Sequence, residues 1–467
     1  MGTRARALAC FLACLLASCT RAPDAVRPSF VLVLADDLGW ADVGFQGSTF
    51  HRTPELDRLA QDGLAFAQAY AAASVCSPSR AALLSGLAPA RLHLTDALGP
   101  RTRTAERPDA DRDDPRGLRE PIVATRLPAG LPTLATRLGE AGYETLWIGK
   151  WHLEGTPEEA GFARALGHSS AGAPATYFSP YGLPTLPDGP AGEYLTDRLT
   201  DEACRFLAGP HERPFLLVLS HYAPHVPLEA PPALVAEFQA RVEPSAGQRN
   251  PLYAAMLARL DASVGRVRAT LEQEQRLERT LLVFTSDNGA VEELRMDRKR
   301  RGEGGDGEPY AITSNAPLRG GKGRLTEGGL RVPLVLLGGP LVRRGTSALP
   351  VVGTDLAPTL LALAGAEPLP ATDGLDLAAY LGGAPEPPPR ALAFHFPHQS
   401  FQSALRVGDE KLLHCWLDGK SELYALDADP GEAHDLAAQR PARAAELEQE
   451  LMAWLDAVGA SRPERRP

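Results

Sequence analysis

Runs of consecutive apolar residues recur at wide intervals along this chain. Three of them, at residues 29–35, 214–220 and 280–286, are rich in Val, Leu and Phe and show no alternation with polar residues. Strands buried on both faces of a parallel sheet have this pattern. Between the runs we predict helices, at residues 53–64, 131–141, 195–207 and 250–277. Strands that alternate with helices predict a doubly wound α/β fold with a mostly parallel sheet.

A second pattern begins after a Pro-rich stretch at 382–389, which is a candidate linker. Beyond it the apolar residues form short strand-like pieces and then a helix at 442–457, where Leu447, Leu451 and Leu455 share one face. We therefore expect a main domain at 29–385 and a small carboxyl-terminal subdomain, an antiparallel sheet plus a helix, at 386–467.

The first 19 residues resemble an export signal. Arg4 and Arg6 precede an apolar run that is too short to remain as a membrane span. The run ends in Leu16-Ala17-Ser18-Cys19, which resembles the lipobox of a bacterial lipoprotein. On this interpretation Cys19 is lipidated, residues 20–28 form a tether, and the protein is exported to the bacterial periplasm or outer membrane. The alternative is an ordinary cleaved signal peptide in which Cys19 has no role.

Composition narrows the possible functions. The 467 residues carry a net charge of -10, which disfavours a nucleic-acid binder. We expect the protein to associate with the membrane only through the lipid anchor. Of the six cysteines, Cys10 and Cys14 fall in the leader, and Cys19 and Cys76 each belong to a motif. Only Cys204 and Cys415 remain without an assigned role. This is not a disulfide scaffold, and whether those two pair stays open.

Oxygen-bearing side chains follow two of the predicted strands. Asp36 and Asp37 end the first, and Asp287 and Asn288 end the third. Ligands of such sheets bind at the carboxyl ends of the strands. Adjacent carboxylates need either water or a dication, and oxygen ligands suit Ca²⁺ or Mg²⁺ better than zinc. A solvated turn and a metal site are both compatible with the Asp pair taken alone.

Cys76 stands at the start of a short apolar helix, with Arg80 one turn further on. The helix dipole and the guanidinium would both favour an anion there. A buried cysteine with only a packing role is the simpler alternative. Lys150 and His152 follow another short strand, and we expect them to project the same way from an extended chain. His225 follows the strand at 214–220.

Two motifs together resemble the signatures of the formylglycine-dependent, or type I, sulfatases. They are Cys-x-Pro-Ser-Arg-x-x-Leu-x-x-Gly from Cys76 and Gly-Tyr-x-Thr-x-x-x-Gly-Lys-Trp-His from Gly142. The later Gly-Lys-Gly around Lys322 and Glu-Gly-Gly-x-Arg-x-Pro from Glu327 also match. The resemblance covers about residues 29–460 and implies a fold like that of alkaline phosphatase.

The resemblance implies that a formylglycine-generating enzyme oxidises Cys76 to formylglycine, whose hydrate is the nucleophile. It implies a catalytic set formed by Cys76, Arg80, Lys150, His152, His225 and Lys322. It implies a metal, Ca²⁺ with Mg²⁺ as the alternative, held by Asp36, Asp37, Cys76, Asp287 and Asn288. The segment Phe394–His398 is similar to bacterial enzymes that desulfate carbohydrates, so we expect substrate contacts from His395, His398 and Arg319.

The expected reaction is hydrolysis of a sulfate ester, either on a carbohydrate or on an aryl group. Two alternatives remain open. One is a phosphate or phosphonate ester hydrolase of the same fold. The other is a catalytically dead, lipid-anchored protein that only binds glycans.

Overall fold

The computed structural model describes residues 27–110, 117–243, 245, 247–292 and 311–466. The expected leader with Cys19, and most of the expected tether, lie outside the described residues. Among the residues that are described, none of the helices has the length and apolar character needed to cross a membrane. Cys204 and Cys415 are both free thiols.

An eight-stranded sheet forms the centre of the molecule, with the strand order β10-β2-β9-β8-β1-β7-β5-β6. β1 pairs in parallel with β7 and β8, and β5 pairs in parallel with β7 and β6. β9 runs antiparallel to both β8 and β2, so the sheet is mixed but mostly parallel. The strands are β1 (Ser29–Ala35), β2 (Leu64–Phe66), β5 (Glu144–Gly149), β6 (Arg164–Leu166), β7 (Phe215–Ser220), β8 (Thr280–Ser286), β9 (Leu334–Leu337) and β10 (Gly345–Ser347).

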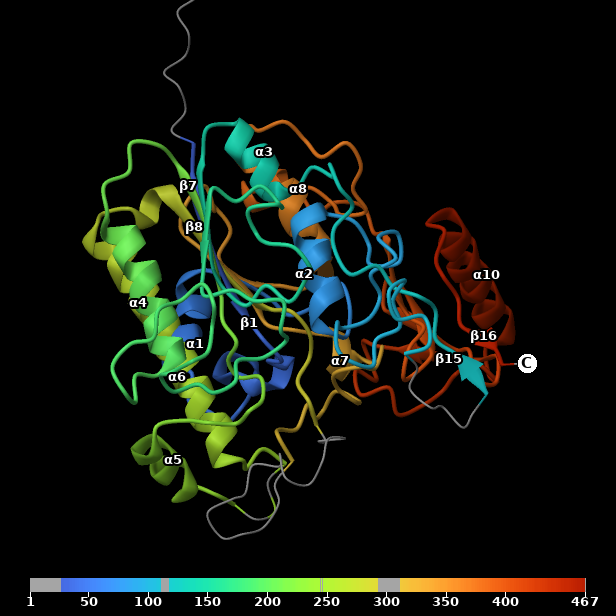
Figure 1. Ribbon diagram of the computed structural model, residues 1–467. Helices are drawn as coiled ribbons and strands as arrows, with labels where there is room; N and C mark the ends of the chain where they lie inside the picture. Colours follow the sequence, from blue (N-terminus) through green and yellow to red (C-terminus); the bar gives the residue numbers. More distant parts are fainter. Residues whose placement is uncertain (1–26, 111–116, 244, 246, 293–310, 467) are drawn as a thin grey trace, which may run out of the picture.

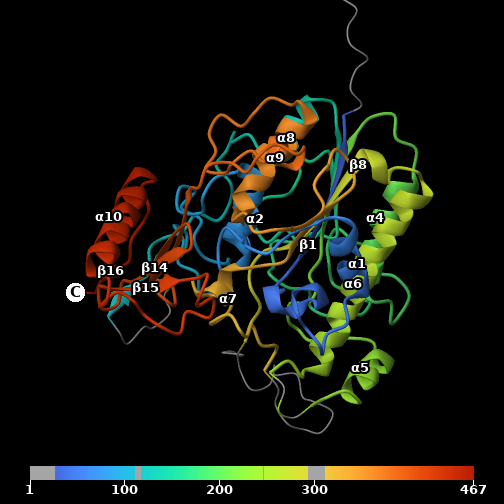
Figure 2. The ribbon, with the colours of Figure 1, turned by 180° about the vertical axis from the view of Figure 1, so that it is seen from behind.

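Helices cover both faces of this sheet (Figures 1 and 2). Successive residues of a strand point to opposite faces, and the core divides accordingly. Val31 and Val33 of β1 pack in the layer of α1 (Pro54–Asp62), α4 (Leu195–Ala208), α5 (Pro232–Gln239) and α6 (Pro251–Gln273). Phe30 and Leu32 pack in the layer of α2 (Cys76–Ser85), α3 (Leu134–Glu140), α8 (Leu356–Ala364) and α9 (Ala378–Leu381). The predicted doubly wound α/β class is confirmed.

The carboxyl-terminal part is an antiparallel sheet of four strands with one helix against it. The elements are β12 (Ala391–Phe396), β13 (Gln402–Val407), β14 (Glu410–Cys415), β15 (Lys420–Ala425) and α10 (Pro441–Ala457). Leu447, Leu451 and Leu455 of α10 pack on one face of this sheet, as their spacing predicted. Phe394 and Phe396 of β12 share a core with Val75, so the other face of the sheet lies against the segment that carries Cys76.

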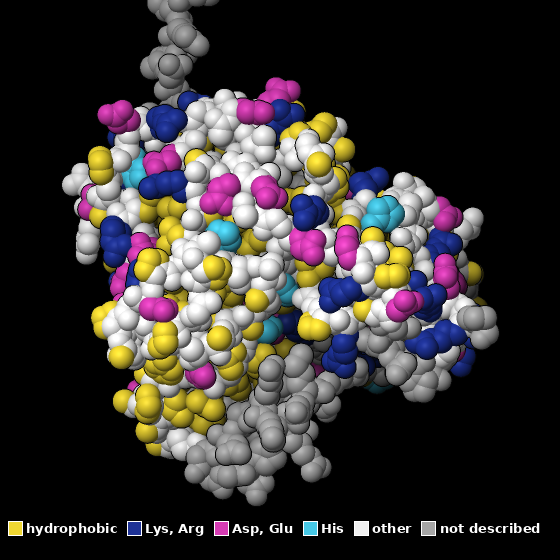
Figure 3. Space-filling model, in the orientation of Figure 1, with side chains coloured by type: hydrophobic (Ala, Val, Ile, Leu, Met, Phe, Trp, Pro, Cys, Tyr) yellow, Lys and Arg dark blue, Asp and Glu magenta, His cyan; other side chains and the backbone are white. Residues whose placement is uncertain are grey.

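Short elements complete the fold and join its two parts. They are β3 (Ala69–Tyr70), β4 (Leu118–Arg119), α7 (Glu327–Leu330), β11 (Val351–Val352) and β16 (Glu464–Arg465). Lys411 of β14 lies 2.9 Å from both Glu327 and Glu432, a buried ion-pair group between the two parts. In the space-filling view, His and basic side chains gather in a recess beside the lobe that carries α10 (Figure 3).

Candidate active site

Three segments that are distant in the sequence meet at the carboxyl-terminal edge of the parallel strands. Asp36 and Asp37 follow β1, Lys150 follows β5, and Asp287 and Asn288 follow β8. Because these strands run in the same direction, their ends lie at one edge of the sheet. The sequence predicted this arrangement from the positions of the polar residues after the apolar runs.

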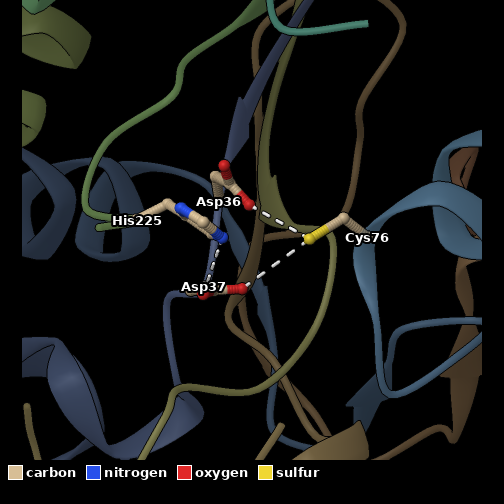
Figure 4. A group of neighbouring side chains, drawn as sticks. All are labelled: Asp36, Asp37, Cys76 and His225. Carbon is tan, nitrogen blue, oxygen red and sulfur yellow. Dashed lines mark hydrogen bonds and ion pairs between the residues drawn. The ribbon is translucent and has the colours of Figure 1, made fainter. Parts of the chain in front are cut away.

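Cys76 faces the two aspartates from the start of α2 (Figure 4). Its Sγ lies 3.4 Å from Asp36 Oδ1 and 3.9 Å from Asp37 Oδ1. Lys322 Nζ lies 3.3 Å from the same sulfur. Burial raises the pKa of the Cys76 thiol despite the nearby lysines, so the unmodified side chain remains a thiol and is a weak nucleophile.

The backbone at Asp37 is held in a left-handed conformation, with φ of 64°. Its N–H donates to Asp287 Oδ1 at 3.2 Å, and its carbonyl accepts a hydrogen bond from the Tyr253 hydroxyl, also at 3.2 Å. The same hydroxyl oxygen lies 2.7 Å from Oδ2 of the buried Asp42, so its one hydrogen is shared between these two acceptors. The contacts of Asp287 and Tyr253 hold the main chain at Asp37, which fixes the point from which its carboxylate projects. The motifs in the sequence gave no sign of Tyr253.

Arg80 lies deep in the site and binds Asp287. Its Nε and Nη2 both donate to Asp287 Oδ2, at 2.9 and 2.7 Å. Its Nη1 donates to the Lys150 carbonyl at 2.9 Å and to Ser220 Oγ at 2.6 Å. The guanidinium therefore joins the ends of β5, β7 and β8, and Nη2 also lies 4.0 Å from Asp36 Oδ1.

Two lysines place positive charge beside the aspartates. Lys150 Nζ lies 2.5 Å from Asp36 Oδ2, and Lys322 Nζ lies 2.8 Å from Asp37 Oδ2. Burial is the largest single influence on Lys322 and acts to lower its pKa, but the negative charges around it, Asp37 foremost, together raise that pKa. For Asp37, burial acts to raise the pKa, yet Lys322, His225 and Lys150 together hold it below the ordinary range. The Asp37–Lys322 pair is thus fully ionised at neutral pH.

His152 has a defined tautomer. Its Nε2 lies 2.9 Å from the Leu98 carbonyl, which can only accept, so Nε2 carries the hydrogen. Nδ1 is buried and has no hydrogen-bond partner within the described part of the chain. Burial, followed by the charge of Lys150, holds the pKa of His152 well below its usual value. A neutral imidazole with an unshared lone pair on Nδ1 is suited to accepting a proton.

The expectation that Lys150 and His152 project from an extended chain is wrong. β5 ends at Gly149, which has φ of 95°, and His152 itself has φ of 59°. A Cβ at Gly149 would lie 2.0 Å from the Ser220 carbonyl oxygen, so β5 and β7 need glycine to approach this closely. Both side chains still reach the site, because the chain turns sharply there rather than continuing as a strand.

His225 lies at the opposite side of Asp37 from Cys76 (Figure 4). Its Nδ1 donates to the Val226 carbonyl at 2.7 Å, and its Nε2 lies 3.6 Å from Asp37 Oδ2. Burial, followed by the charge of Lys322, lowers the pKa of His225 to about 3. His225 is therefore neutral under ordinary conditions.

The donor set fits a hard dication. Asn288 Oδ1 is buried without a hydrogen-bond partner among the described residues, while its Nδ2 donates to Asp37 Oδ1 at 2.8 Å. Asp36, Asp37, Cys76 and His225 each offer an atom within 4.8 Å of the others. Carboxylate and amide oxygens with an unsatisfied oxygen among them favour Ca²⁺ or Mg²⁺. Both oxygens of Asp287 already accept hydrogen bonds, from Asp37 N and Arg80.

The three predicted substrate residues face other groups of the protein. His395 contacts Ser403 Oγ at 2.7 Å and the Ser461 carbonyl at 2.9 Å. Arg319 donates to the Tyr424 hydroxyl at 2.9 Å and stacks over that ring. His398 is buried against Thr95. Contact between these residues and a carbohydrate stays a prediction.

Comparisons with known proteins agree on one family. The family model described as Sulfatase matches residues 28–366. Human Arylsulfatase A is 31% identical over 467 aligned residues, which span 88% of this chain and 83% of the relative. A Sulfatase of Formosa agariphila is 28% identical and covers 94% of this chain and 91% of its own. The crystal structure of Ps i-CgsB in complex with k-i-k-neocarrahexaose superposes with a TM-score of 0.72 at 28% identity, covering 92% of this chain and 93% of the other.

Proposed function

Because this chain belongs to the sulfatase family, we propose that it removes sulfate from a sulfated carbohydrate by means of a formylglycine at position 76 and a bound dication. It is a sulfatase, a hydrolase of sulfate esters. The proposal of a formylglycine and a dication rests on the position of Cys76, whose Sγ lies within 4 Å of Asp36, Asp37 and Lys322. A side chain converted there would face both the metal ligands and a ring of positive charge.

Two groups not encoded as ordinary side chains complete the chemistry. Formylglycine at position 76, as its hydrate, would supply an oxygen nucleophile and a second hydroxyl whose deprotonation would release sulfate. Asp36, Asp37, Asp287 and Asn288 would hold Ca²⁺ or Mg²⁺, which would supply positive charge for the sulfate oxygens. We propose that the formylglycine-generating enzyme is a partner during maturation.

The remaining steps belong to residues of the chain. Arg80, Lys150 and Lys322 surround the reacting position and stabilise the negative charge that develops on the sulfate oxygens. The departing alcohol oxygen needs a proton when its bond to sulfur breaks. Lys322 is the suitable donor, because Asp37 keeps it protonated and it lies 3.3 Å from the position-76 sulfur.

His152 and His225 differ in role. The lone pair on His152 Nδ1 can accept the proton of the hydroxyl that expels sulfate, which restores the aldehyde. His225 is neutral and already donates its Nδ1–H to Val226, so its low pKa favours Lys322 over His225 as the proton donor. Its Nε2 is directed toward Asp37.

A carbohydrate substrate is supported by the likeness to Ps i-CgsB, whose structure contains k-i-k-neocarrahexaose. Aryl sulfates remain suitable test substrates, since human Arylsulfatase A is also a relative. We further propose that residues 29–385 and 386–467 act as a catalytic domain and a subdomain beside its entrance. Export with the leader removed and lipid attached to Cys19 is part of the same proposal.

Paired substrates test the reaction. The purified protein, matured with a formylglycine-generating enzyme, is given an aryl sulfate and the matching aryl phosphate. We expect faster turnover of the sulfate, loss of that turnover in Cys76→Ala, and its retention in Cys204→Ala, because Cys204 is a free thiol on α4. Faster turnover of the phosphate, or sulfate turnover that survives Cys76→Ala, contradicts the proposal. A panel of sulfated oligosaccharides then identifies the sugar.

A further inference from the structure

We propose that Asp96, Glu120 and His398 form a second metal site, for a borderline transition dication such as Zn²⁺, separate from the aspartate site at Cys76. Each residue offers one ligand atom, and these three atoms all lie within 4.8 Å of one another. The residues are 0%, 2% and 1% exposed. They come from three remote segments, the loop after α2, the residue after β4 and the turn after β12.

Each of the three side chains is oriented through its other polar atom. His398 Nε2 lies 2.9 Å from Thr95 Oγ1. Glu120 Oε1 accepts from the Gln399 N–H at 3.0 Å, and Asp96 Oδ1 accepts from the Ala97 N–H at 2.9 Å. Metal-binding histidines and carboxylates are characteristically held in this way, with one atom on the metal and the other in a hydrogen bond that fixes the orientation.

His398 Nδ1 supplies the independent observation. It is buried and has no hydrogen-bond partner among the described residues, although a buried ring nitrogen ordinarily has one. It lies 3.7 Å from Glu120 Oε2, which is too long for a hydrogen bond. Two ligands on one tetrahedral zinc ion lie about 3.4 Å apart, given zinc–ligand bonds of about 2.1 Å. The spacing fits two ligands of a shared ion.

The ligand chemistry distinguishes this site from the aspartate site. An imidazole nitrogen with two carboxylates suits zinc, whereas Ca²⁺ and Mg²⁺ take oxygen ligands. No residue is shared between the two sites, so each can be emptied without altering the other's ligands.

Such an ion would fix the segments that line the catalytic residues. Thr95 and Asp96 begin the loop in which Leu98 binds both Ser77 Oγ and His152 Nε2. His398 and Gln399 belong to the carboxyl-terminal subdomain. The zinc site would therefore join that subdomain to the loop that sets the tautomer of His152. Its occupancy does not depend on whether the protein hydrolyses sulfate.

The test measures zinc content. Tag-free Cys76→Ala protein, which lacks the active-site thiol, is stripped with a chelator and dialysed against micromolar Zn²⁺ with millimolar Ca²⁺ to occupy the aspartate site. Mass spectrometry of the metals should give one equivalent of zinc per chain. We expect His398→Ala and Glu120→Gln in this background to lose that zinc. His395→Ala should retain it, because both ring nitrogens of His395 are bound within the protein.

No retained zinc in the Cys76→Ala protein, or zinc retained equally in both ligand variants, overturns the proposal. If the ligand variants fail to fold, anomalous diffraction at the zinc edge from the otherwise unaltered chain decides. A peak among Asp96, Glu120 and His398 supports the site, and a peak elsewhere or none rejects it. Because these measurements do not use turnover, their failure is distinct from failure of the proposed reaction.

Discussion

Replacing Arg80 by methionine keeps most of the side-chain stem and removes the guanidinium from a site with no exposure to water. In the structure Asp287 Oδ2 accepts two hydrogen bonds from Arg80, at 2.9 and 2.7 Å, and neither side chain is more than 1% exposed. Breaking one partner of a buried ion pair leaves an uncompensated charge and costs about 3–5 kcal/mol. We expect Arg80→Met to lower the free energy of unfolding by that amount.

A double-mutant cycle isolates the pair. Asp287→Asn and the double variant Arg80→Met/Asp287→Asn complete the cycle, and urea unfolding is followed with chelator present so that metal binding does not contribute. The double variant should be about 2–3 kcal/mol more stable than the sum of the two single losses predicts. The control is Arg52–Glu237, an ion pair with side chains 54% and 49% exposed, where Arg52→Met should cost at most about 1 kcal/mol.

Strict additivity in the Arg80–Asp287 cycle would refute the assignment of this pair. So would equal losses for Arg80→Met and Arg52→Met. Either result would mean that the guanidinium is not held by Asp287 in solution, and the positive charge assigned to the sulfate position would then need another source.

Three other variants or treatments follow from the same structure. Gly149→Ala should prevent folding, since its Cβ would lie 2.0 Å from the Ser220 carbonyl oxygen. The control is Gly142→Ala, which should cost only about 1 kcal/mol, because Gly142 has φ of 87° but open space around it. Expression yield and thermal melting compare the two variants. Burial lowers the pKa of His221 to about 3, whereas the unfolded value is about 6.5, so the stability that this neutral histidine contributes above pH 6.5 is lost as the pH falls, by about 2 kcal/mol at pH 5. His221→Asn should therefore flatten that part of the profile of unfolding free energy against pH. A profile unchanged by the substitution would count against a buried neutral histidine. Chelation should lower the melting temperature and abolish turnover, with Ca²⁺ restoring both; full activity in excess chelator would contradict the metal assignment.

The apolar runs predicted the central strands closely. The intervals 29–35 and 280–286 coincide with β1 and β8, because strands buried on both faces are mostly apolar and lack the alternation of half-exposed strands. The same reasoning placed Asp36, Asp37, Asp287 and Asn288 together, since parallel strands end at one edge. The small subdomain was also predicted, from Leu447, Leu451 and Leu455 and the short strands before them.

What the sequence did not reveal depends on contacts between remote segments. The antiparallel direction of β9 follows from the path of the chain and not from its apolar pattern. The Leu98 carbonyl that sets the tautomer of His152 is a backbone atom, so no residue type marks it. The sequence predicts a strand that continues past Gly149, because the alternation of side chains does not show that Gly149 has a positive φ and lies against the Ser220 carbonyl.

The measurement closest to the central claim is the mass of the peptide that contains Cys76, taken from protein purified from its native host. The account predicts an aldehyde-bearing residue at position 76, reactive toward hydrazide reagents, in the fraction of molecules that hydrolyse sulfate esters. An intact thiol throughout an active preparation would contradict it.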